Sequence, residues 1–246
     1  MLDWRAEACP FALLKSRTCL DDYGRHSTLA NDCLARLHAS FAPLCAKPVV
    51  REHAMDVDFG TYHYSTPKES NDIRERTEKA FSKLLRSLYP SSARLRILDA
   101  GCGLGFLTYV AAKCFPKARI TGVDLFRRGS MSEISMDKAT NNMRSLGIDS
   151  RTSFLKHDLT RPMESNAQYD LAVSNLVFHN MGKKRFKAYE TVFDALKSRG
   201  FFVIGDLFLH RTSDIDYFRQ RSTVIDELDG TSSGPSVYKI EVLRKA

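Results

Sequence analysis

The sequence has no apolar run close to the roughly 20 residues that a membrane-spanning helix requires. Residues 1–17 contain acidic side chains and no sustained apolar stretch, so we expect no secretory signal. The six cysteines include no C-x-x-C pair, which argues against a zinc site and favours reduced thiols. We therefore expect a cytoplasmic protein without a metal and without a membrane partner.

Motifs of nucleic-acid binding are also missing, although the net charge is +8. The densest basic cluster is MGKKRFK, residues 181–187, and no RNP-type, zinc-finger or Gly-Arg motif accompanies it. A solvated helix start explains such a cluster at least as well as a phosphate-binding patch does. RNA stays open as a partner, but composition alone does not favour it.

Residues 1–54 differ from the rest of the chain, since they hold four of the six cysteines and the only tryptophan. A fourfold spacing of apolar residues in positions 29–41 predicts a helix there. We expect residues 1–54 to be a partly helical, poorly ordered extension, with Met55 as an alternative natural start. Residues 55–246 would form one domain, made of a lid-like segment (55–70), a leading helix (71–89), a ligand-binding core (95–210) and a tail with a helix and an edge strand (211–246).

Within the core, short apolar strands alternate with helices. The expected strands are 94–100, 118–125, 151–159, 169–178 and 200–209, and the expected helices are 106–115, 130–148 and 183–199. Continuous apolar strands of this kind predict an α/β fold, a doubly wound parallel sheet with helices on both faces. Right-handed crossovers place the carboxyl ends of the strands, and hence the ligand, at one edge.

The tail allows two interpretations. Residues 213–230, SDIDYFRQRSTVIDELDG, are compatible with one helix, because Ile215, Phe218, Ile225 and Leu228 share a face. Alternatively, their second half is a strand that forms a hairpin with residues 236–245. The later strand is the firmer expectation of the two.

The stretch ILDAGCGLGFLTYVA, residues 97–111, predicts a buried strand that enters a glycine turn and continues as a helix. Its glycines are spaced G-x-G-x-G, and Phe106 stands where the dinucleotide fingerprint has its third glycine. Asp99 precedes the first glycine by two residues, where a carboxylate would repel a pyrophosphate and attract a cationic group. Both features argue against NAD.

Polar side chains also stand at the ends of the next strands. Asp124 could bridge the hydroxyls of a ribose, a feature shared with NAD enzymes, and Asp158 could accept from the amine of an adenine. Ser174 and Asn175 end the strand over 169–178. Polar groups at successive strand ends favour a nucleoside ligand.

The segments ILDAGCGLGFLT, ITGVDLF, FLKHDLT and YDLAVSNLVFHNM, in this order, resemble the class I S-adenosylmethionine-dependent methyltransferases over residues 70–210. The resemblance implies a Rossmann-like sheet of six or seven strands, the last one antiparallel, and S-adenosyl-L-methionine as cofactor. In this scheme Asp124 holds the ribose, Asp158 with Leu159 holds the adenine, and Asn175 lies near the transferred methyl. The methionine part would contact Asp99, Ala100, Gly101, Cys102, Gly103 and Gly105, with Leu125 and Tyr64 as further cofactor contacts.

The methyl acceptor is less well defined by the sequence. His179, just after the strand over 169–178, is the candidate catalytic base or substrate-positioning group, and a local hydrogen-bonding role is the alternative. SNLV replaces the [DNS]-P-P-[YFW] motif of family members that methylate adenine N6 or glutamine amides. A short loop after residue 209 leaves little room for a large acceptor, which favours a small molecule. RNA or protein as acceptor, a non-catalytic cofactor-binding protein and, least, an NAD-dependent oxidoreductase stay as alternatives.

Overall fold

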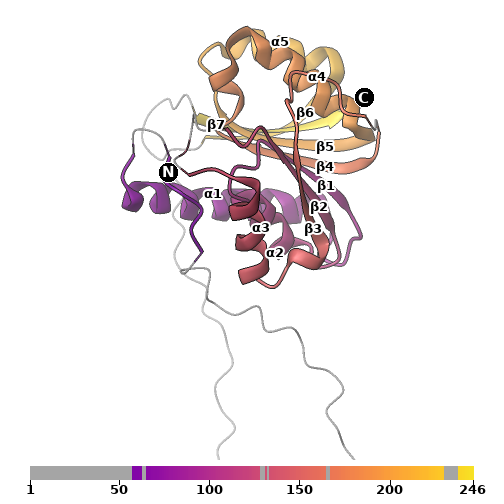
Figure 1. Cartoon of the computed structure of the whole chain (residues 1–246). Helices are drawn as coiled ribbons and strands as arrows, with labels where there is room; N and C mark the ends of the chain where they lie inside the picture. Colours follow the sequence, from indigo (N-terminus) through magenta and orange to yellow (C-terminus); the bar gives the residue numbers. More distant parts are fainter. Residues whose placement is uncertain (1–56, 63–64, 128–130, 132, 165–166, 230–237) are drawn as a thin grey trace, which may run out of the picture. The chain divides into compact units, whose positions relative to one another are not determined.

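The computed structural model describes residues 57–62, 65–127, 131, 133–164, 167–229 and 238–246 (Figure 1). The expectations for residues 1–54, for Met55 and for Tyr64 concern residues outside this part of the chain. The elements in chain order are α1 (Pro67–Leu88), β1 (Arg96–Ala100), α2 (Phe106–Cys114), β2 (Arg119–Asp124), α3 (Met136–Ser145), η2 (Asp149–Arg151), β3 (Thr152–Lys156), β4 (Tyr169–Asn175), η3 (Phe178–Lys184), α4 (Arg185–Ala195), β5 (Leu196–Leu207), α5 (Arg211–Arg221), β6 (Ser222–Asp229) and β7 (Tyr238–Lys245).

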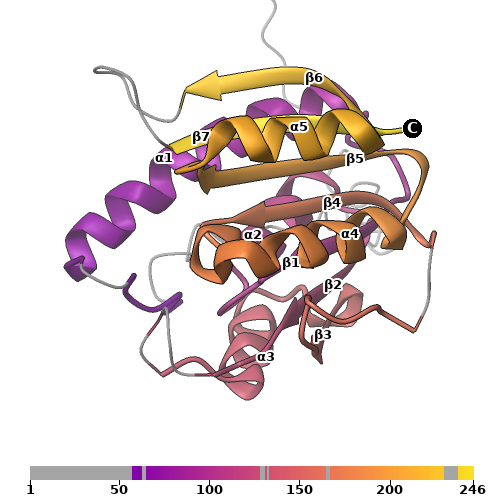
Figure 2. The ribbon, with the colours of Figure 1, turned by 90° about the horizontal axis from the view of Figure 1, so that it is seen from above.

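The strands form one seven-stranded sheet in the order β3-β2-β1-β4-β5-β7-β6 (Figure 2). Strands β1 to β5 pair in parallel, and β7 is antiparallel to both β5 and β6. This confirms the doubly wound, mostly parallel Rossmann-like sheet with an antiparallel end. The strand order reverses between β1 and β4, the place where open α/β sheets bind their ligands.

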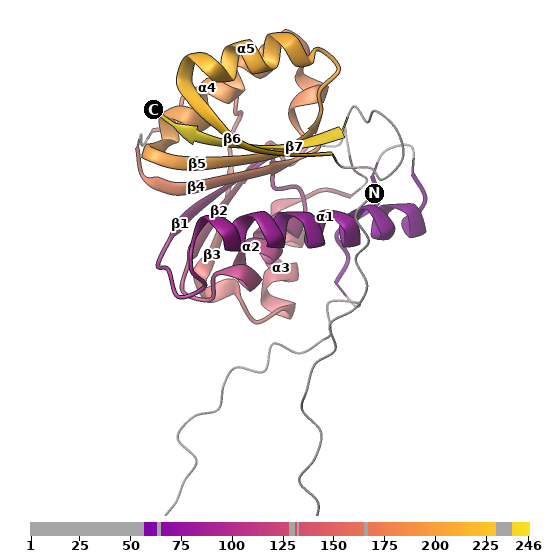
Figure 3. The same ribbon diagram turned by 180° about the vertical axis from the view of Figure 1, so that it is seen from behind.

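Helices cover both faces of the sheet, α1, α2 and α3 on one and α4 and α5 on the other (Figure 3). Successive residues of a strand point to opposite faces, so β1 divides its side chains between two cores. Ile97 belongs to the core that contains Phe81 of α1, whereas Leu98 belongs to the core that contains Tyr189 of α4. The same alternation later separates two groups of polar side chains at the carboxyl edge.

Helix α1 begins at Pro67, four residues earlier than the sequence predicts, so the lid-like segment ends sooner than expected. The reason is a capping box, a reciprocal pair of hydrogen bonds between an N-cap residue and the third helical residue. Thr66 Oγ1 accepts from the Glu69 backbone N–H at 3.2 Å, and a Glu69 carboxylate oxygen accepts from the Thr66 N–H at 2.7 Å. Pro67 occupies a first-turn position that needs no N–H donor.

The tail contributes one helix and two strands, so the single-helix interpretation of residues 213–230 is wrong for their second half. Helix α5 stops at Arg221, and Ser222–Asp229 forms β6. β-branched residues favour this outcome, and β7 supplies hydrogen-bonding partners along the whole strand. The later strand, β7, was expected at the edge of the sheet. This expectation is wrong, because β7 lies between β5 and β6.

Candidate functional site

The turn after β1 brings three glycines into conformations with positive φ, +78° at Gly101, +53° at Gly103 and +89° at Gly105. The N–H groups of Gly101 and Cys102 both donate to the Val123 carbonyl, at 2.8 and 3.1 Å. A Cβ at Gly101 would come within 3.0 Å of the Val177 side chain. Glycine is therefore required at this position by backbone conformation and by space.

A cleft of about 370 Å³, open to solvent, lies over this turn. Five of the predicted cofactor residues line it: Asp99, Gly101, Cys102, Gly103 and Asn175. Phe59 and Tyr62 of the predicted lid-like segment also line it, and so do five residues that the sequence did not mark as contacts, namely Arg74, Leu104, Phe106, Leu107 and Met131. Phe59, Tyr62 and Arg74 come from the segment before β1, which carries no motif of its own.

Asp99 is an acid buried at the base of the cleft, only 1% exposed. The Thr108 hydroxyl donates to its carboxylate at 2.7 Å. Burial raises the pKa of Asp99 to about 7, against 3.8 for an ordinary aspartate. A cationic group in the cleft would favour the ionised form, and a positively charged ligand group beside Asp99 stays a prediction.

Asp124, at the end of β2, adjoins the glycine turn without lining the cleft. Its Oδ2 accepts from the Gly103 N–H at 3.0 Å, and its Oδ1 accepts from the Phe126 N–H at 2.8 Å. Burial raises the pKa of this carboxyl group, and the backbone hydrogen bonds oppose that effect. The bonds fix the orientation of the carboxylate and leave lone pairs on both oxygens, which suits the recognition of two neighbouring hydroxyls.

Other predicted cofactor residues lie away from the cleft. Asp158 forms a turn at the end of β3, in which its Oδ1 accepts from the Thr160 N–H and hydroxyl at 2.9 and 2.7 Å. The Ala100 and Leu159 side chains pack in the core beneath α4. Leu125 is half-buried and does not line the cleft. These residues could reach a cofactor only by backbone groups or from the rim.

Two residues of the glycine turn have packing roles. A Cβ at Gly105 would lie 2.8 Å from Met143 Cε, so this glycine permits close packing of α2 on α3. Cys102 is buried, and burial raises the pKa of its thiol well above the ordinary range. An inert packing thiol agrees with both observations.

His179 lies at a second cavity, which like the cleft is partly open to solvent. The cavity is lined by His179, Gly182, Arg185, Tyr189, Leu207, Leu209, His210 and Asp214. His179 Nδ1 is 2.5 Å from Oδ1 of Asp206, a buried residue at the end of β5. Asp206 Oδ2 accepts from the Phe178 N–H at 2.7 Å, which fixes the carboxylate against the turn that carries His179. Asp206 was not predicted as a site residue, although its position near the carboxyl end of a strand is typical of site residues in such sheets.

The cleft and the second cavity share the carboxyl edge of the sheet but belong to opposite faces. Gly205 faces α1, since a Cβ there would meet Phe81 and the Asn175 amide. The next residue, Asp206, therefore faces α4 and contacts Phe178 and His179. The sequence predicted His179 beside the methyl group, and the structure places it across the edge from Asp99.

The described part of the chain holds no cluster of His, Cys, Asp and Glu side chains that would suit a metal ion. Among the same residues, no helix is long and apolar enough to cross a membrane.

A parallel sheet with a glycine turn after β1, a buried acid before it and a second acid at the end of β2 defines a nucleoside-cofactor-binding α/β domain. A family model described as "Methyltransferase domain" matches residues 91–228. The chain belongs to this family, the class I S-adenosylmethionine-dependent methyltransferases, whose cofactor is S-adenosyl-L-methionine.

The chain is similar to a malonyl-[acyl-carrier protein] O-methyltransferase of Acetivibrio thermocellus, with 31% identity over 47% of this chain and 38% of the relative. It is also similar to a release factor glutamine methyltransferase of Koribacter versatilis, with 31% identity over 42% of this chain and 33% of that protein. These matches span well under half the length of the curated relatives. Among solved structures, the 1,6-didemethyltoxoflavin-N1-methyltransferase of Burkholderia thailandensis, bound to S-adenosylhomocysteine, aligns with a TM-score of 0.53 at 17% identity, covering 74% of this chain and 91% of that chain.

Proposed function

We propose that this protein transfers a methyl group from S-adenosyl-L-methionine to a small molecule whose accepting atom carries a proton. The cofactor supplies a methyl group that is already activated by its sulfonium, so the protein mainly has to align the acceptor with it. In the transfer, the accepting atom forms a bond to the methyl carbon, the sulfur–methyl bond breaks, and the acceptor's proton passes to a base. The base in this proposal is His179, which would act on an acceptor that lies across the shared carboxyl edge, between the cofactor cleft and the second cavity.

The residues of the cleft fit the cofactor in chemistry. Asp99 would take the ammonium of the methionine part, and the glycine turn allows the backbone to approach it closely. Asp124 would accept from the ribose hydroxyls, and Asp158 would approach the adenine from the rim. Asn175 Oδ1 already accepts from the Tyr238 hydroxyl at 2.7 Å, which orients its amide toward the cleft that it lines.

The observation that carries the proposal is the contact between His179 Nδ1 and Asp206 at 2.5 Å. A carboxylate at Nδ1 favours the tautomer with the proton on that nitrogen, which leaves Nε2 able to accept a proton. A general base in this position contributes about 10²- to 10⁴-fold to the rate. His179 lines the second cavity, so an acceptor bound there would meet the proposed base.

The contact between His179 and Asp206 also favours an acceptor different from those that the names of the similar proteins indicate. A malonyl carboxylate is ionised at neutral pH and needs no base, whereas a hydroxyl does. A protein acceptor, as in the release factor enzyme, remains the second candidate because of that similarity. The SNLV segment argues against it, and RNA as acceptor rests only on the basic charge balance of the chain.

A cytoplasmic location belongs to the same proposal. Two free cysteines, Cys102 and Cys114, are buried in the described part of the chain, and reducing conditions would keep such thiols free.

The test incubates the full chain with methyl-labelled cofactor and a fractionated cell extract. We expect label in the small-molecule fraction. Label in protein or RNA would contradict the small-molecule assignment, and no label in any fraction, despite cofactor binding, would favour a non-catalytic protein.

With the labelled acceptor in hand, we expect His179→Ala to lower kcat by about 10²- to 10⁴-fold while cofactor affinity stays within about twofold. Asn180→Ala, on the exposed side of the same turn, is the matched control and should keep full activity. Full activity of the His179 variant would leave this histidine a local structural role only.

A further inference from the structure

Arg74, on α1, is a buried cation at the wall of the cofactor cleft. Its side chain is only 7% exposed, and it lines the cleft together with Asp99. Its guanidinium donates to the Phe59 carbonyl at 3.0 Å, to the Gly60 carbonyl and to Asn71 Oδ1 at 3.0 Å. All of these acceptors are neutral oxygens.

No carboxylate of the described residues lies within ion-pair distance of this guanidinium. Asp58, whose charge acts on Arg74, pairs instead with Lys138 at 2.6 Å. A buried charge without a counter-ion is costly, because solvation is lost and no Coulomb attraction replaces it. Such a cation facing a cleft indicates an anionic ligand group.

The cleft therefore presents two charges of opposite sign that do not neutralise each other. The Tyr62 ring lies beneath the guanidinium, 4.7 Å from it. Burial raises the pKa of the Tyr62 phenol, Arg74 opposes this shift, and Asp99 adds to it, so the phenol lies within the field of both charged groups. A carboxylate, a guanidinium cation and a phenol around one cleft are complementary in charge to an α-amino-acid end group. The ammonium and the carboxylate of such a group are attached to the same carbon.

We propose that Arg74, assisted by the Tyr62 hydroxyl, binds the carboxylate of the cofactor's methionine part while Asp99 binds its ammonium. This inference deepens the cofactor half of the proposed function and does not depend on the methyl acceptor. It adds two residues outside the segments that carry the family resemblance. Arg74 is suited to the task because its planar guanidinium matches the geometry of a carboxylate.

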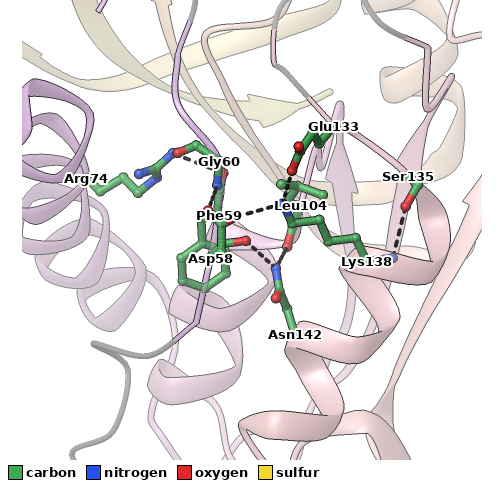
Figure 4. Close-up of polar contacts among 9 residues, drawn as sticks. All are labelled: Asp58, Phe59, Gly60, Arg74, Leu104, Glu133, Ser135, Lys138 and Asn142. Atoms are coloured by element: carbon green, nitrogen blue, oxygen red, sulfur yellow. Dashed lines mark hydrogen bonds and ion pairs between the residues drawn. The ribbon is translucent and has the colours of Figure 1, made fainter. Parts of the chain in front are cut away.

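Arg74 also ties the cofactor to the strap, by which we mean residues 57–62. Figure 4 shows the strap between Arg74 on one side and α3 on the other. On the α3 side, Asn142 Nδ2 donates to the Asp58 carbonyl at 3.0 Å and to the Leu104 carbonyl at 2.9 Å. Because the same guanidinium holds the strap and the carboxylate, binding of the cofactor should make the strap more rigid.

The test compares two ligands that differ only in the carboxylate, S-adenosylmethionine and its decarboxylated form, by calorimetry on the full chain. We expect Arg74→Gln to weaken S-adenosylmethionine by about 10- to 100-fold, the range of a lost charge-assisted hydrogen bond, and the decarboxylated ligand by no more than about twofold. Tyr62→Phe should weaken the first ligand only, by a smaller factor. Arg76→Gln, an exposed arginine on the same helix, is the matched control.

The outcomes separate this inference from the proposed function. An equal loss for both ligands would assign Arg74 a purely structural role and overturn the inference, as would an unchanged preference for the carboxylate. Failure of the unaltered protein to bind either ligand would overturn the cofactor site and this inference together. Partial recovery of the preference in Arg74→Lys would support the charge interaction.

Discussion

Asp99 and Arg74 are buried charges of opposite sign, and each lacks a counter-ion within the cleft. Asp99 lies near the end of β1, a strand that its own sequence context predicts, two residues before Gly101. Arg74 reaches the same cleft from α1, 25 residues before Asp99 in the chain, and no local sequence pattern marks it. Burial gives both residues their importance, because a charge in a low-dielectric site interacts strongly with whatever neutralises it.

The raised pKa of Asp99 leads to a pH dependence of cofactor binding. Below its pKa of about 7, Asp99 is mostly protonated in the free protein. The cofactor's ammonium, in contrast, favours the ionised form of Asp99. Binding therefore releases a proton, and affinity should rise with pH by up to about tenfold per unit below 7 and then level off. Calorimetry across this range checks the profile.

Asp99→Asn should flatten that profile, and the exposed Asp216→Asn on α5 should leave it unchanged. The same shift acts on stability with a defined sign. Because the native state binds this proton more tightly than the unfolded chain does, the free protein should lose stability as pH rises from about 4 to about 7. A stability that rises with pH over this window, and rises equally in the variant, would contradict the role of Asp99.

At the scale of elements, the strap and α3 are joined by the buried side chain of Asn142 and by the more exposed ion pair of Lys138 with Asp58. Asn142 is 8% exposed, and its amide bridges the Asp58 and Leu104 carbonyls, which belong to segments far apart in the chain. The sequence placed Asn142 inside a predicted helix, which was confirmed, but helical periodicity does not reveal what a polar residue on the buried face contacts. The sequence predicted that a lid-like segment exists, but only the tertiary structure shows that Arg74 and Asn142 hold it.

We expect Asn142→Ala to free the strap. The Asp58 and Leu104 carbonyls lose their hydrogen-bond donor, which should lower the free energy of unfolding by about 1–3 kcal/mol. Amide hydrogen exchange in residues 57–62 should become faster, while α4 and α5 stay protected. Hydrogen exchange measured by mass spectrometry gives the comparison. Asn141→Ala, exposed on the same helix, is the control, and equal exchange in both variants would show that Asn142 does not hold the strap.

At the scale of the whole molecule, the sheet depends on its last strand. β7 supplies pairing to β5 on one side and to β6 on the other, and its Ile240, Val242 and Leu243 side chains are almost fully buried. Chain order suggests that a final strand is a dispensable edge. Topology reverses that conclusion, because β6 forms the edge and β7 lies inside the sheet.

Removal of residues 238–246 should therefore abolish cooperative folding, since it opens the β5 edge and strips both cores of buried apolar side chains. Thermal unfolding followed by circular dichroism is the measurement, with removal of Ala246 alone as the control. A truncated chain that unfolds cooperatively near the temperature of the full chain would mean that β1 to β5 form an independent unit.

The sequence by itself determined the family, the parallel sheet, the glycine turn and the acids at the strand ends. These features are local, because each depends on a strand of a few residues and on what immediately follows it. Tertiary structure alone decided which side chains meet. Asp206 finds His179, and Tyr238 finds Asn175, through strand pairing between residues 27 and 63 positions apart. The two-residue alternation of strands then directs Gly205 and Asp206 to opposite faces, which separates the cofactor cleft from the cavity of the proposed base.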